Sequence, residues 1–120
     1  MATFSKTILS GSTDGKGIKV AATATAGTTI HTGSATATTL DEIWLYAVNT
    51  SASDVKLTVE WGGVAAPDDL IEYTVAAEDG LYLIVAGGII KGNATPLVVR
   101  AWAGSANVIV IHGYVNQITA

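Results

Sequence analysis

Residues 54–62 read Asp54-Val55-Lys56-Leu57-Thr58-Val59-Glu60-Trp61-Gly62. Apolar side chains take every second position of this stretch, and polar side chains take the positions between. Successive side chains of a β-strand point to opposite sides of the sheet, so the alternation predicts a strand with one buried face and one solvent face. The apolar set includes Trp61, which we therefore expect in the core. Gly62-Gly63 then predicts a turn that ends the strand.

Similar strands are predicted along most of the chain. Residues 71–75 repeat the alternation, whereas three runs rich in β-branched residues are apolar at every position and are typical of strands covered on both faces. These runs are 43–48, 81–86 and 108–111. Arg100 interrupts a fourth apolar run, 97–103, and must reach solvent or a partner.

Clusters of Gly, Asn, Asp and Ser separate eight or nine such runs, and no segment predicts a helix of ordinary length. The expected fold is therefore all-β, an antiparallel two-sheet sandwich. A jelly roll is preferred over an immunoglobulin-like topology. We expect one domain over residues 1–120, with residues 1–16 forming either a docking arm or the first strand.

The composition narrows the class of partner. Charged residues are 13% of the 120-residue chain, about half the usual share, and such a weakly charged surface suits burial in an assembly as well as an ordinary Thr-rich sheet. The net charge is −4, and the six Lys and Arg form no cluster, so we expect no nucleic-acid partner. No apolar run is long enough to span a membrane, and the first ten residues lack the apolar region of a signal peptide.

Residues 21–39 contain almost only small and polar side chains, with Ile30 as the one core anchor. This segment fits a pair of thin edge strands, a long loop that orders against a neighbouring subunit, or a surface meander without function. Small side chains allow close approach of backbones, which makes an inter-subunit surface a hypothesis for the segment.

No group of residues predicts catalysis. Adjacent carboxylates on a strand point to opposite faces and cannot form the facing pair of a glycosidase. No serine lies in a Gly-x-Ser-x-Gly elbow, and the turn at Asp68-Asp69 lacks the spacing of a calcium loop. His31 and His112 have no cysteine or third ligand in a zinc pattern, and a strand histidine hydrogen-bonded at an interface is the better interpretation. We therefore expect no enzyme activity and no catalytic, cofactor-binding or metal-binding residue.

The tryptophans offer a second kind of site. Trp44, Trp61 and Trp102, together with four tyrosines, fit either core packing or a sugar-stacking platform. Trp44 and Trp102 lie in runs that are apolar on both sides, which favours burial.

Three stretches resemble the small structural proteins of tailed bacteriophages. They lie within residues 40–120 and are Asp54-Val-Lys-Leu-Thr-Val-Glu-Trp-Gly-Gly, Pro67-Asp-Asp-Leu-Ile-Glu-Tyr-Thr-Val, and Leu97-Val-Val-Arg-Ala-Trp-Ala-Gly-Ser-Ala-Asn-Val-Ile-Val-Ile-His-Gly-Tyr-Val-Asn-Gln-Ile. The resemblance rests on a pattern of strands and turns.

This resemblance implies a capsid decoration, or cement, protein. Such a protein is made in the host cytoplasm and located on the outside of the virion, where it binds the major capsid protein and stabilises contacts between neighbouring subunits. A homotrimer is implied as well, with no catalytic residue and no cofactor. The alternative is a receptor- or glycan-binding β-sandwich domain of a phage fibre, which would use exposed tryptophans.

Overall fold

The computed structural model describes residues 2–120, and this part of the chain contains nine strands and no helix. The strands form two antiparallel sheets packed face to face, which confirms the predicted all-β sandwich. Their bounds are β1 Thr3–Ile8, β2 Ile18–Lys19, β3 Thr28–Thr32, β4 Leu40–Asn49, β5 Val55–Trp61, β6 Leu70–Val75, β7 Tyr82–Lys91, β8 Val98–Ala103 and β9 Ile109–Thr119.

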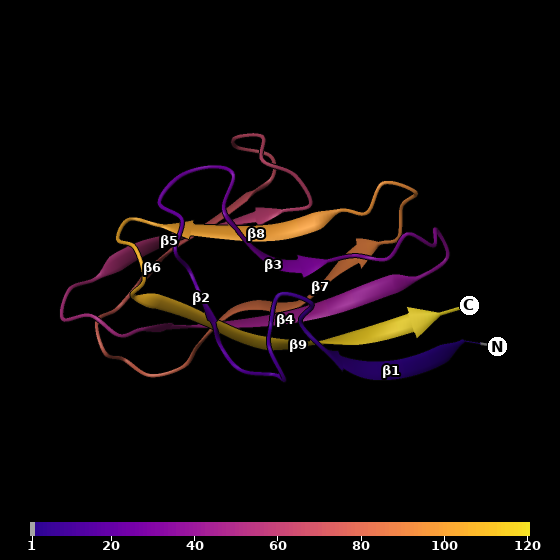
Figure 1. Cartoon of the computed structure of the whole chain (residues 1–120), viewed down its shortest axis with the longest axis horizontal. Helices are drawn as coiled ribbons and strands as arrows, with labels where there is room; N and C mark the ends of the chain where they lie inside the picture. Colours follow the sequence, from indigo (N-terminus) through magenta and orange to yellow (C-terminus); the bar gives the residue numbers. More distant parts are fainter. Residues whose placement is uncertain (1) are drawn as a thin grey trace.

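The chain crosses between the sheets at most connections. Sheet A has the order β1-β9-β4-β7, with β2 pairing beside β1 on the same edge of β9, and sheet B has the order β3-β8-β5-β6. Figure 1 shows the two layers, with β8 and β3 in one and β9, β4 and β1 in the other. The termini lie together because Thr3 on β1 is the register partner of Thr119 on β9.

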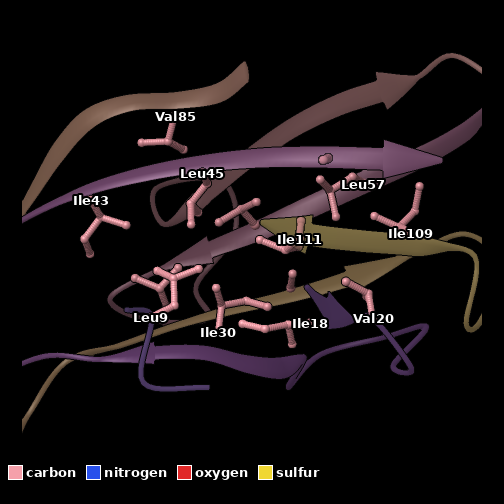
Figure 2. Packing of buried hydrophobic residues seen from close by; sticks show 14 of the residues in the cluster. Leu9, Ile18, Val20, Ile30, Ile43, Leu45, Leu57, Val85, Ile109 and Ile111 are labelled. Atoms are coloured by element: carbon pink, nitrogen blue, oxygen red, sulfur yellow. The ribbon is translucent and has the colours of Figure 1, made fainter. Parts of the chain in front are cut away.

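The core fills the space between the sheets. It consists of aliphatic side chains, and Figure 2 shows Leu45 of β4, Leu57 of β5 and Ile111 of β9 in the middle of the cluster, with Ile43 toward one end. These side chains occupy alternate strand positions, as the period-two pattern predicts. Trp61 packs against this cluster, in agreement with the expectation for the opening stretch.

The outward side of β5 departs from the prediction. Thr58 and Glu60 lie on the face expected to meet solvent, yet both are fully buried. For Glu60 the reason is that residues 21–27 fold against this part of sheet B. Glu60 accepts hydrogen bonds through Oε1 from the Gly27 amide, at 2.7 Å, and through Oε2 from the Thr25 hydroxyl.

Residues 21–39 are therefore ordered by contacts within this chain, without a neighbouring subunit. Thr28–Thr32 form the edge strand β3, and Ile30 is fully buried as the expected core anchor. The Ala22 carbonyl accepts from the Ala103 amide and continues the pairing along β8. A Cβ at Gly27 would lie 2.4 Å from the Ala101 carbonyl oxygen, so only glycine permits this close approach.

Replacing Glu60 tests this intramolecular cover. Glu60→Ala removes the acceptor for the Gly27 amide, and we expect the free energy of unfolding to fall by about 1–3 kcal/mol. Denaturant unfolding measures that loss, and hydrogen exchange at Gly27 should become faster. Glu72→Ala is the matched control, because the Glu72 carboxylate is half exposed in its pair with Lys56 and should cost less than about 1 kcal/mol. Equal effects of the two substitutions would contradict the assigned role of Glu60.

Candidate functional site

The outer face of sheet A, here called the A face, carries mainly apolar and aromatic side chains. The strand register places alternate residues of β1, β9, β4 and β7 on this side, opposite the core. The apolar members of the A face are Phe4, Ile8, Leu40, Trp44, Tyr46, Val48, Leu83, Ala86, Ile89, Val110, Tyr114 and Ile118. Its polar members are Lys6, Lys19, Glu42, Lys91, His112 and Asn116.

Much of this apolar surface is open. The exposed fractions are 72% for Phe4, 53% for Ile89 and 48% for Ile8. Antiparallel sheets with one solvent face normally alternate apolar-in and polar-out, as β5 of sheet B does with Lys56. Sheet A lacks that alternation because runs 43–48 and 108–111 are apolar at every position. These strands were predicted to be covered on both faces. Within this chain only their inner face is covered, by sheet B.

Two stacked rings occupy the middle of the A face. The ring planes of Trp44 and Tyr114 are 9° apart and their centroids 6.2 Å apart. The Lys6 Nζ lies 4.9 Å from the centroid of the Tyr114 ring, within the range of a cation–π contact. Gly87 is a bulge residue of β7 with φ +74°, and a Cβ there would lie 3.2 Å from Trp44, so this glycine leaves room for the indole.

One carboxylate lies among these side chains. The Glu42 Oε1 accepts from the Asn116 side-chain amide at 2.9 Å and from the Trp44 Nε1 at 2.8 Å. These hydrogen bonds, that from Asn116 above all, lower the pKa of Glu42 below its ordinary value. The charged carboxylate thus holds the indole in place and does not stand free in the apolar surface.

Lysines lie around this surface. Lys6 on β1 and Lys19 on β2 lie at one margin of sheet A, Lys91 lies on β7 at the other, and all three are exposed. With Glu42 as the one carboxylate on it, the A face is net positive. The rest of the chain has three basic and nine acidic residues.

A second polar group joins the two sheets inside the sandwich. His31 of β3 and Asp41 of β4 are buried, with His31 Nε2 2.8 Å from Asp41 Oδ2. The Ser10 amide donates to His31 Nδ1 at 3.0 Å, so Nδ1 must accept, and Nε2–H is left to donate to Asp41. Gln117 of β9 donates to Asp41 Oδ1.

This group is structural in its geometry although it contains serine, histidine and aspartate. The Ser10 hydroxyl accepts from the Thr32 amide at 2.6 Å, and the histidine nitrogens are engaged by a backbone amide and a carboxylate. No nitrogen is therefore free to remove the serine proton, as nucleophilic catalysis requires. The expected hydrogen bond of a strand histidine is present in His31, but its partner is within this chain.

The remaining sequence candidates stay apart. Asp41 points inward and Glu42 outward, as expected for strand neighbours. Asp69 accepts from the Ala65 amide within its own turn. Between Ala2 and Ala120 there is no cluster of three potential metal ligands and no ligand-sized pocket. The same residues include no helix of a length and apolarity that would cross a membrane.

The tryptophans divide between core and surface. All three are half buried: Trp61 packs against the core between the sheets, whereas Trp44 and Trp102 lie on the outer faces of sheets A and B. Burial was expected for both. The signal that was missed is the length of the chain. Apolar residues on both sides of a strand predict that both sides are covered, but 120 residues supply too few strands to cover both faces of sheet A.

Comparison with known proteins gives no match. No protein-family model, no curated protein and no solved structure matches this chain. The A face is accordingly assigned from its own geometry.

The Glu42 network predicts a measurable titration. Asn116→Ala removes the hydrogen bond that contributes most to the lowered pKa of Glu42, so we expect this pKa to rise toward its ordinary value. NMR titration of the Glu42 carboxyl carbon measures the change, with Asn93→Ala in an exposed loop as the control. Because the folded-state pKa is lowered, the Glu42 interaction stabilises the fold above the unfolded-state pKa and is lost as the pH falls through the folded-state pKa. An unchanged pKa in Asn116→Ala would contradict the assignment.

Proposed function

We propose that this chain is a structural virion protein without enzymatic activity. It binds the outer surface of a bacteriophage capsid and stabilises contacts between major capsid subunits, as a decoration protein does. The A face is the observation that carries the proposal, because it is an extended apolar surface that the chain leaves uncovered. The resemblance of residues 40–120 to small phage structural proteins supplies the kind of partner.

The size of the A face suits a protein contact. Four strands about 4.8 Å apart, each presenting a side chain about every 6.8 Å over at most five rows, give the whole face, polar side chains included, an area of at most roughly 650 Å². Its apolar part, about two-thirds of the face, lies within the roughly 300–600 Å² of the largest apolar patch of a typical monomer, which is often functional. The whole face approaches the roughly 800 Å² that each partner contributes to a standard interface. Aromatic residues at the centre are typical of such interfaces.

The strand order supports the jelly-roll form of the sandwich. Only the β5–β6 hairpin joins consecutive, directly paired strands. The chain changes sheet between β2 and β3, β3 and β4, β4 and β5, β6 and β7, β7 and β8, and β8 and β9. An immunoglobulin-like sandwich keeps more consecutive strands within one sheet. Jelly rolls are common in viral capsid domains, which is an analogy of fold and agrees with the proposed role.

The N-terminal residues contribute to the proposed docking surface. Thr3–Ile8 form β1, which pairs with β9 and presents Phe4 and Ile8 on the A face. Leu9 and Ser10 have different roles, because Leu9 is a buried core residue and Ser10 contacts His31 and Thr32. A truncation that tests docking should therefore end at residue 8.

The first test is binding to shells. We expect the protein to co-sediment with undecorated shells assembled from the major capsid protein encoded in the same genome. Those shells should also resist heat or chaotrope better once decorated. Protein that stays in the supernatant, or a source genome without a major capsid gene, would rule out the proposed function.

The second test concerns β1. Removing residues 2–8 should weaken shell binding by at least about tenfold, because it deletes the most exposed apolar side chain of the A face, while the core from Leu9 onward remains. Circular dichroism checks the fold of the truncated chain. Unchanged binding would show that β1 takes no part in docking.

Light scattering of the intact 12.2 kDa chain tests the homotrimer that the resemblance implies.

A glycan-binding fibre domain is the second candidate, and the Trp44–Tyr114 pair favours it. Stacked, half-buried rings on an open sheet provide apolar planes for sugar rings. If the chain has this role, the wild type should bind on a glycan array and not to shells, and Trp44→Ala should abolish the glycan binding. Binding to shells without glycan binding favours the capsid role.

A further inference from the structure

We infer that the surface which docks on the A face has an apolar centre and an acidic rim, and that it belongs to the capsid and not to a second copy of this chain. The inference rests on the proposed function and adds the chemistry of the partner. It is carried by the placement of the lysines around the A face.

The basic residues are concentrated where the acidic residues are scarce. Half of the six Lys and Arg of an acidic chain lie on one sheet face, beside a single carboxylate. Lys19 on β2 and Lys91 on β7 lie at opposite margins of the sheet, and the Lys6 ammonium lies over the Tyr114 ring, 4.9 Å from its centroid. An apolar centre with a charged rim is the usual anatomy of a protein–protein interface.

Glu42 does not neutralise this rim. Its carboxylate is engaged by Asn116 and Trp44, and the one ion pair of a lysine or arginine with a carboxylate among residues 2–120 joins Lys56 to Glu72. Lys6, Lys19 and Lys91 therefore have no carboxylate partner in the described part of the chain. Their charges remain available to a partner, and a flexible lysine pairs with a carboxylate at the rim while its alkyl chain covers apolar surface.

A second copy of the chain is a poor occupant. Stacking two A faces would bring two net-positive surfaces together, and like charges oppose association. Nucleic acid also fits poorly, because phosphate binding depends on many basic contacts and the centre of the face is apolar. A capsid surface with carboxylates around apolar side chains satisfies both parts of the A face.

Charge reversal tests the rim. Lys6→Glu combined with Lys91→Glu should weaken co-sedimentation with shells by at least about tenfold, because it places carboxylates opposite carboxylates. Lys56→Glu, on the outer face of sheet B, is the control and should bind as the wild type does. All the substituted side chains are exposed, so thermal unfolding should change little.

Salt separates the two parts of the contact. Raising the salt from about 0.05 M to about 0.5 M shortens the range of charge interactions. It should weaken wild-type binding several-fold and strengthen the binding of the Lys6→Glu, Lys91→Glu variant, because salt screens the repulsion between its carboxylates and those of the capsid. Ile89→Ser should weaken binding at both salt concentrations, because it removes an apolar contact at the face.

The outcomes distinguish this inference from the proposed function. Wild-type protein that fails to bind shells overturns both. Wild-type binding that Lys6→Glu with Lys91→Glu leaves unchanged or strengthens overturns the acidic rim alone. A-face variants that lower the solution mass but keep full shell binding would show that a second copy occupies the face, and would also overturn the inference.

Discussion

The structure depends on one constraint: sheet A is apolar on both faces, and the chain covers only one of them. The inner face is buried against sheet B by aliphatic side chains, among them those of β4 and β9, and this burial stabilises the fold. The outer face presents Trp44, Tyr114 and Phe4 instead of the polar residues that a solvent-facing sheet carries. Apolar area left in contact with water favours association, so the uncovered face links the fold to binding.

The outer face of sheet B, unlike that of sheet A, does not expose a large apolar surface. Its outward side has polar residues, and residues 21–27 fold against it, held by the two oxygens of Glu60. On the inner side, the His31–Asp41 contact joins β3 of sheet B to β4 of sheet A and satisfies buried polar groups that would otherwise destabilise the core. The outer face of sheet B is therefore polar and partly covered by the chain itself, whereas the outer face of sheet A is mainly apolar and uncovered.

Local pattern predicted the fold class well and the site poorly. Alternation in residues 54–61 and 71–75 identifies strands and their inward side chains because the period of a strand is a local property. The burial of Glu60 could not be predicted, since it depends on a loop more than thirty residues earlier in the sequence. Asp41 lies in phase with Ile43 and Leu45, which signals burial, but its partner His31 on β3 follows only from the packing of two sheets. The lysine rim likewise requires the register that brings β1, β2 and β7 to the margins of one face.

Cryo-electron microscopy of the decorated shell tests the central claim most directly, because it shows which side of the sandwich meets the capsid. Our account predicts that the outer face of sheet A lies on the shell, with Trp44 and Tyr114 buried and sheet B turned toward solvent. Density in which sheet B or the β6–β7 edge contacts the capsid, with the A face open to solvent, would contradict the account.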